Sequence, residues 1–102
     1  ICKRLFGLEK PADTQSLNKS YYYPLMDELV TNIFFTNGEN DPWSNLSLAE
    51  KNGNAVNAKL TYQLIEGAAH CDDLRTPRTQ DSESIKKARH TMDSLLEHWL
   101  VN

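Results

Sequence analysis

The sequence lacks an apolar run of about 18 residues, the length at which a helix can cross a bilayer. It also lacks an excess of positive charge, because 11 Lys and Arg stand against 14 Asp and Glu and give a formal net charge of −3. A protein that binds nucleic acid or an anionic membrane surface through basic side chains needs the opposite balance. Membrane insertion and nucleic-acid binding are therefore excluded.

The chain is short. It has 102 residues, starts at Ile1 rather than Met, and is 39% hydrophobic with a mean hydropathy of −0.60. These values are typical of a soluble globular protein and allow one small domain at most. The first residue predicts a fragment or a processed chain.

Two cysteines and two glycosylation patterns bear on the cellular compartment. Cys2 and Cys71 could pair with each other, stay free, or pair with a cysteine outside this chain. Asn-Lys-Ser and Asn-Leu-Ser make Asn18 and Asn45 candidate N-glycosylation sites in polar surroundings. Together these patterns favour a secretory compartment.

The N-terminal third holds little regular patterning. Residues 1–8 predict the last turns of a short helix that ends at Gly7, because glycine readily adopts the positive φ of a helix end. Residues 9–31 are polar, contain prolines and show no steady period, which predicts a long irregular connection. Such a connection is unusual inside a compact domain, so we expect it to pack on a part that is absent here.

Two short segments predict β-strands. Residues 33–36 are β-branched and aromatic without alternation, as in a strand buried on both faces. The pair Asn37-Gly38 then predicts a turn. Residues 60–65 predict a second strand, and a helix is expected between the strands over residues 44–53.

The C-terminal segment predicts an amphipathic helix that follows a loop over residues 68–80. Apolar residues recur there at steps of three and four and form one stripe of Ile85, Ala88, Met92, Leu95, Leu96 and Trp99. Asp81 or Ser82 is expected to cap the start of the helix. Alternating strands and helices predict a parallel α/β sheet, and two parallel strands are too few to stand alone. We therefore expect one end of a larger α/β sheet.

Polar loops follow both predicted strands, and such loops carry the working residues of open α/β sheets. Asp41 lies in the first loop and His70 in the second. An Asp can accept the Nδ1 proton of a His, fix its tautomer and stabilise its charged form. The sequence predicts that these two side chains face each other. His90 lies opposite the apolar stripe and His98 on its flank, so both are expected at the surface.

A metal site over the run His70–Asp73 is a weaker alternative. Consecutive residues cannot easily converge on one ion, and the sequence has no second His/Cys cluster. Asp72 and Asp73 are expected to serve in a local turn or an ion pair. No metal and no cofactor is predicted.

The two loops carry motifs that resemble the signatures of a known family. The run NIFFTNGENDPWS over residues 32–44 and the run EGAAHCDDLR over residues 66–75 are similar to sequences of the prolyl serine exopeptidases, which include carboxypeptidases and dipeptidyl peptidases. The order of the motifs and the C-terminal amphipathic helix also fit. The resemblance covers essentially the whole chain.

This resemblance implies an α/β-hydrolase fold. Residues 32–102 would form the C-terminal part of the hydrolase domain, with the last parallel strands, the acid loop, the His loop and the C-terminal helix. Residues 1–31 would be the tail of a helical insertion and a connection, with the upstream sheet and most of the insertion missing. By resemblance, Asp41 is the triad acid, His70 the triad base, and Trp43 part of the pocket for the substrate's proline. Without the resemblance, Trp43 is expected to be a buried core residue or an indole that anchors its loop.

The nucleophile of such a peptidase is absent from this chain. It would be a Ser between closely spaced glycines on a strained turn, yet no Ser lies within two residues of any glycine. The resemblance therefore implies the C-terminal segment of a serine exopeptidase that cleaves after proline, in the lysosome or secreted. The alternative is a non-catalytic binding or interaction protein of the same fold. An upstream Gly-x-Ser-x-Gly would support the enzyme, and its absence would support the binding protein.

The partners that the resemblance implies are a proline-containing peptide and the remainder of the same polypeptide, with a homodimer of the parent left open. The family places a cysteine before a Phe-Gly-like pair, as Cys2 precedes Phe6-Gly7 here. This implies that Cys2 pairs with an upstream cysteine rather than with Cys71. The choice between carboxypeptidase and dipeptidyl peptidase stays open.

Overall fold

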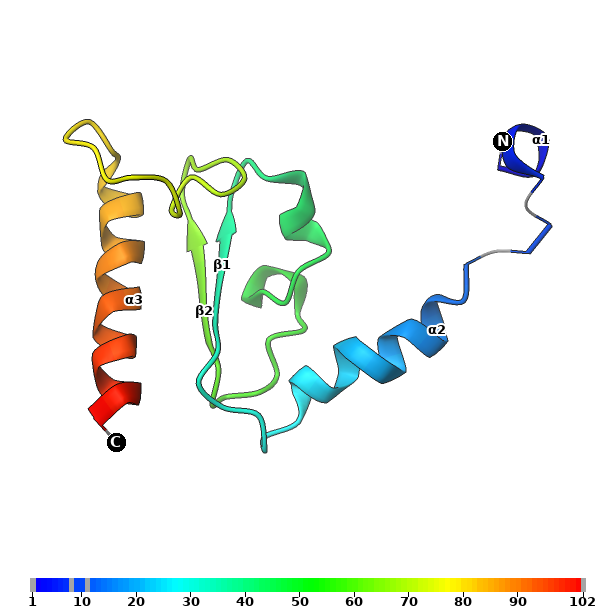
Figure 1. The fold of residues 1–102 in the computed structure, drawn as a ribbon, viewed down its shortest axis with the longest axis horizontal. Coiled ribbons are helices and arrows are strands. Elements are labelled where there is room, and N and C mark those ends of the chain that lie inside the picture. The colour runs from blue at the N-terminus through cyan, green and yellow to red at the C-terminus, as the bar shows by residue number, and fades with distance from the viewer. Residues whose placement is uncertain (1, 8, 11, 102) are drawn as a thin grey trace.

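The computed structural model describes residues 2–7, 9–10 and 12–101. Strands β1 (Phe34–Gly38) and β2 (Thr61–Ile65) lie beside the long helix α3 (Glu83–Val101), and the N-terminal residues form an arm that leads away from them (Figure 1). The radius of gyration is 17.0 Å, whereas a compact domain of this length has about 13 Å. The extended shape leaves many apolar side chains exposed.

The N-terminal helix ends where the sequence predicts. Helix α1 spans Cys2–Phe6 and stops at Gly7, which has a φ of 65° and donates its amide hydrogen to the carbonyl oxygen of Lys3 at 3.0 Å. The side chain of Cys2 lies outside the described part of the structure, so its pairing with an upstream cysteine stays a prediction. Cys71 is exposed and free.

The irregular connection predicted over residues 9–31 is wrong for its middle part. Helix α2 (Thr14–Leu17) continues into a π-helical turn (Asn18–Tyr22) and a 3₁₀ helix (Tyr23–Met26). Asp13 caps the start by accepting a backbone hydrogen bond at 2.9 Å. None of these helical residues is buried. They therefore lack the apolar period by which a helix is found in a sequence.

The two strands pair in parallel, as the sequence predicts. Phe34–Gly38 runs in register against Thr61–Ile65. The turn predicted at Asn37-Gly38 is wrong, because both residues belong to the strand and the chain turns only at residues 39–40. Asn37 and Gly38 are both buried at the end of the strand.

The helix predicted over residues 44–53 is also wrong. Two short 3₁₀ helices, Pro42–Asn45 and Glu50–Asn52, take its place. The side-chain amide of Asn52 donates to two carbonyl oxygens of the preceding segment at 2.8 and 2.9 Å. Side-chain bonds of this kind compete with the backbone bonds of a helix. Gly53 ends the second turn as predicted, with a φ of 67°.

Helix α3 packs against β2 through the predicted apolar stripe. Ile85 and Ala88 of the helix are buried and form a core cluster with Ile65 and Ala68. Toward the C-terminus of α3 the apolar stripe is only partly buried, and Leu96 is 44% exposed. Helix α3 therefore contributes buried residues only through its first turns.

The start of α3 shows which of the two predicted residues caps the helix. Ser82 is the observed cap, because its Oγ accepts the amide hydrogen of Ile85 at 3.4 Å, whereas Asp81 binds arginine side chains.

In strand β1, Phe34 and Phe35 are only half-buried, so the prediction that this strand is buried on both faces is wrong for this chain. In the part of the chain that the structure describes, β1 pairs with β2 alone. The observed architecture is an α/β arrangement with one small parallel sheet.

Candidate active site

The acid loop begins where β1 ends, and its backbone holds Asp41 in place. Asp41 is buried and caps the following 3₁₀ helix, since its Oδ1 accepts the amide hydrogen of Trp43 at 3.0 Å. The buried hydroxyl of Ser44 donates to the carbonyl oxygen of Asp41 at 2.6 Å. Lys51 donates in turn to that hydroxyl at 2.7 Å. This chain of bonds leaves the second carboxylate oxygen of Asp41 open to the neighbouring loop.

The His loop follows β2 and is bonded directly to the acid loop. The amide of Asn40 donates to the carbonyl oxygen of Ala68 at 2.9 Å. In the opposite direction, the amide of Gly67 donates to the carboxylate of Glu39 at 2.9 Å. These reciprocal bonds hold the two loops side by side at the carboxyl ends of the strands.

Asp41 and His70 are in contact, as the sequence predicts. Nδ1 of His70 lies 2.7 Å from Oδ2 of Asp41. The Asp41 side chain is only 10% exposed, whereas that of His70 is 64% exposed. Among the described residues, Nε2 of His70 has no hydrogen-bond partner. The imidazole is thus bonded to the acid on one side and accessible on the other.

The electrostatics of the pair keep the acid ionised. The hydrogen bond with His70 holds the pKa of Asp41 below its usual value, although burial acts in the opposite direction. The amide of Trp43 and the electrostatic interactions with His70 and Lys51 lower this pKa further. An ionised carboxylate can only accept hydrogen bonds, so the neutral imidazole carries its proton on Nδ1. Nε2 is then free to accept a proton from a third group.

A pocket of about 260 Å³ opens beside the pair. Asp41, Trp43 and His70 all line it, together with Cys71 and Leu74 from the His loop. The indole of Trp43 is 65% exposed. The core position that the residue alone predicts for Trp43 is therefore wrong, and its ring is available to a ligand.

The other candidate residues lie elsewhere. Asn45 is exposed in the 3₁₀ helix after Asp41, and Asn18 is half-buried in the N-terminal arm. His90 and His98 are exposed on α3, as predicted. The local role predicted for Asp72 is confirmed, since its carboxylate accepts the amide hydrogen of Ala69 at 2.7 Å and pairs with Arg75 at 3.1 Å. The local role predicted for Asp73 is wrong, because its carboxylate accepts a hydrogen bond from Thr36 in β1 at 2.8 Å.

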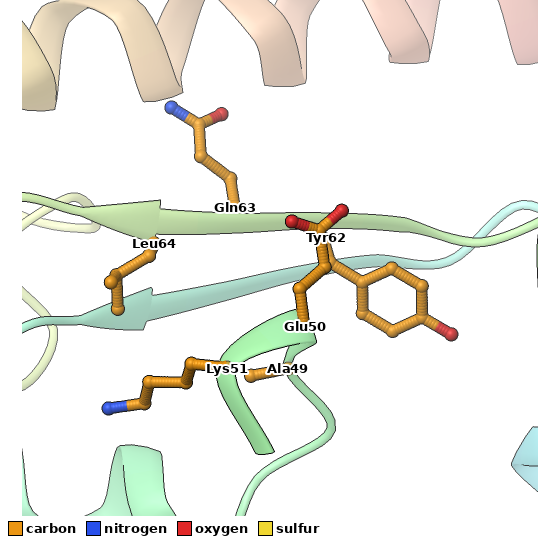
Figure 2. A pocket seen from close by; sticks show the side chains of 6 residues that line it. All are labelled: Ala49, Glu50, Lys51, Tyr62, Gln63 and Leu64. Carbon is orange, nitrogen blue, oxygen red and sulfur yellow. The ribbon is translucent and has the colours of Figure 1, made fainter. Parts of the chain in front are cut away.

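A second pocket, of about 140 Å³, lies on the face of the sheet that points away from α3 (Figure 2). Tyr62 and Leu64 of β2 line it with Glu50 and Lys51, and Gln63 also lines it although its side chain points toward the helix. It contains neither member of the Asp–His pair. Among the described residues no group of His, Cys, Asp and Glu is placed to hold a metal ion, and no described helix is long and apolar enough to span a membrane.

Sequence reasoning missed two side chains that support this site. Lys51 acts through Ser44 on the acid loop, and Arg89 bonds to the backbone of the His loop. Neither residue belongs to the apolar stripe or to the two motifs. Their contacts join segments separated along the chain, so no local pattern could have revealed them.

Replacement of Gly38 by alanine tests how closely the two loops must approach. A Cβ there would lie 2.6 and 2.7 Å from the carbonyl oxygens of Ala68 and Ala69. The backbone before His70 must then shift, and we expect Gly38→Ala to destabilise the full-length protein by about 1–3 kcal/mol. Chemical denaturation measures this. Gly53→Ala is the matched control, because it strains a positive φ without meeting any atom of the His loop.

The position of the pair is typical of one class of protein. An acid and a histidine on loops that follow adjacent parallel strands occur in α/β enzymes in which the imidazole serves as general base. The chain belongs to the serine carboxypeptidase S28 family, whose model matches residues 1–92.

Individual relatives agree with this assignment. The chain is 32% identical to thymus-specific serine protease of Mus musculus over 98% of its own length and 19% of that relative. It is 31% identical to putative serine protease K12H4.7 of Caenorhabditis elegans over 97% of its length and 19% of the relative. It is 37% identical to lysosomal Pro-X carboxypeptidase of Homo sapiens over 69% of its length and 13% of the relative. The chain therefore spans about a fifth or less of these relatives. No solved structure matches it.

Proposed function

We propose that this chain supplies the acid and the base of a serine peptidase that cleaves peptide bonds after proline. The observation that carries the proposal is the 2.7 Å contact between Nδ1 of His70 and Oδ2 of buried Asp41. Membership of the S28 family supports the reaction class, and the name of one relative, lysosomal Pro-X carboxypeptidase, supports proline as the recognised residue.

The chemistry needs a third group from outside these residues. A Ser hydroxyl attacks the carbonyl carbon of the peptide bond, and Nε2 of His70 accepts its proton as the new C–O bond forms. His70 then returns the proton to the leaving amine. Asp41 keeps the imidazole in the correct tautomer and stabilises its charged form during the step. The acyl-enzyme is released by water in the same way, with His70 again as the base.

The proposal places the chain within a longer α/β-hydrolase. Residues 32–102 form the C-terminal part of the hydrolase domain, and residues 1–31 are the tail of a helical insertion and a connection. The half-covered β1 and α3 support this, because parallel sheets are ordinarily covered on both faces. The Ser would come from the part of the polypeptide before this chain.

Trp43 is proposed to bind the proline ring of the substrate. Its exposed indole gives the pocket a flat apolar wall. Loss of a ring-to-ring contact of this size costs about 1.5–3 kcal/mol, so we expect Trp43→Ala to lower kcat/KM roughly 10- to 100-fold for a peptide cleaved after proline. Leu46→Ala is the control, since Leu46 is exposed nearby but does not line the pocket. An unchanged kcat/KM in Trp43→Ala would contradict this role.

The proposed compartment is the lysosome or the secretory pathway, by analogy with the lysosomal relative. Asn18 and Asn45 are then proposed to carry N-linked glycans. We expect N-glycosidase treatment of the full-length protein from a eukaryotic secretory host to lower the mass of the peptides that contain these residues. Peptides whose mass does not change would contradict glycosylation at the corresponding Asn.

A test of the whole proposal uses two peptides that differ only at the residue before the cleaved bond. We expect the full-length protein to cleave the proline peptide at least about 100-fold faster than its alanine counterpart, since a site built around one ring loses most of its binding energy without it. Cleavage of neither peptide would support the non-catalytic alternative. Equal cleavage of both would retain the peptidase and remove the proline specificity.

A further inference from the structure

Arg89 bonds to the segment that directly follows His70. Its Nε donates to the carbonyl oxygen of Asp73 at 2.9 Å, and its Nη2 donates to those of Asp72 and Arg75 at 3.3 and 3.0 Å. The Arg89 side chain is only 13% exposed. A nearly buried guanidinium on α3 therefore donates hydrogen bonds to three backbone carbonyl oxygens of the His loop.

A buried carboxylate fixes this guanidinium in place. Nη1 of Arg89 lies 2.6 Å from Oδ2 of Asp81, which is 1% exposed. Asp81 also accepts hydrogen bonds from the side chain of Arg75 at 3.2 Å and the amide of Arg78 at 2.8 Å. The hydrogen bond from Arg89 is the main cause that holds the pKa of Asp81 below its usual value. Asp81 is thus a stable anion that orients Arg89.

The same segment is tied to the strand and to the turn that carries His70. The hydroxyl of Thr36 in β1 donates to the carboxylate of Asp73 at 2.8 Å. The carboxylate of Asp72 accepts the amide hydrogen of Ala69, the residue before His70, at 2.7 Å. Arg89 therefore binds a short, closely bonded loop that includes His70.

We propose that Arg89, oriented by Asp81, is a positioning residue that holds the His loop on α3 so that the imidazole meets Asp41. This inference rests on the proposed function, because it assigns His70 the role of base. A lysine could not replace this arginine, since a single ammonium cannot reach a carboxylate and the spread carbonyl oxygens in one plane.

The experiment compares Arg89→Met with Lys87→Met in the full-length protein. Lys87 is an exposed cation on the same helix, outside the apolar stripe, so its replacement removes the same charge without touching the His loop. Two measurements are made on folded protein: steady-state kinetics, which give kcat and KM for a proline-containing peptide, and amide hydrogen exchange by mass spectrometry over residues 66–75. We expect Arg89→Met to lower kcat about 10- to 100-fold with little change in KM, since a displacement near 1 Å costs about this much. Exchange over residues 66–75 should rise at least about tenfold, and Lys87→Met should change neither quantity.

The outcomes separate this inference from the proposed function. A kcat within twofold of the wild type in Arg89→Met overturns the positioning role, even if the melting temperature falls. A lower kcat without faster exchange overturns it as well. If Arg89→Met does not fold, Arg89→Lys replaces it, and a wild-type kcat in that variant overturns the inference. If His70→Ala retains activity, the proposed function fails, while the exchange data still decide whether Arg89 holds the His loop.

Discussion

Replacement of His70 by alanine in the full-length protein is expected to lower kcat for a proline-containing peptide by between about 10³- and 10⁶-fold, with KM changed far less. Among the described residues, His70 alone offers an imidazole that lies 2.7 Å from the carboxylate of Asp41, is 64% exposed and lines the pocket. Without it, no described imidazole lines the pocket. Steady-state kinetics with the purified variant measure the loss.

The matched control for this substitution is His90→Ala. His90 is the same residue type, exposed on α3, and it does not line the pocket that holds Asp41. Its replacement should leave kcat within about twofold, since surface substitutions have small effects. A folded His70→Ala protein with near wild-type kcat would remove the proposed role of His70 as the base.

Replacement of Asp41 by asparagine is expected to lower kcat by about 10⁴-fold. The new side chain keeps the shape of the old one and an oxygen that can accept the amide hydrogen of Trp43, so the acid loop should stay folded. It has no charge to stabilise the imidazolium, and its amide group can turn toward Nδ1 and leave the proton on Nε2. In that tautomer His70 cannot accept the proton of the nucleophile. The loss should therefore appear in kcat.

The control for the acid is Asp93→Asn. Asp93 is exposed on α3 and far along the chain from both loops, so the same chemical change there should leave kcat nearly unchanged. Circular dichroism and a denaturation curve show whether each variant is folded. A folded Asp41→Asn protein that retains more than about a tenth of the wild-type kcat would contradict the role of Asp41.

Those parts of the fold that depend on buried apolar residues could be predicted from the sequence. The β-branched and aromatic residues of both strands and the three-and-four spacing of the stripe on α3 place these elements to within a few residues. The helices over residues 14–26 could not be found, because they are held by a local cap and bury nothing. The helix predicted over residues 44–53 failed because asparagine side chains bond the backbone there instead.

Some residues of the candidate site could likewise be predicted from the sequence, and others could not. Asp41 and His70 could be predicted, since each follows a strand and parallel strands bring such loops to one edge. Arg89 could not be predicted, because its partners are backbone carbonyl oxygens that come within reach only when the loop folds onto α3. The spacing of apolar residues shows only that Arg89 lies outside the apolar stripe, and it does not predict the contacts of the guanidinium.

The most direct test of the Asp41–His70 pair as catalytic machinery is the rate at which an organophosphorus fluoride modifies the full-length protein. Such a reagent reacts with a Ser whose hydroxyl is activated by an adjacent base. The account predicts one modified Ser, located by mass spectrometry outside residues 1–102, and a rate of modification that falls at least about 10³-fold in His70→Ala. Absence of modification in the wild type, or an equal rate in His70→Ala, would contradict it.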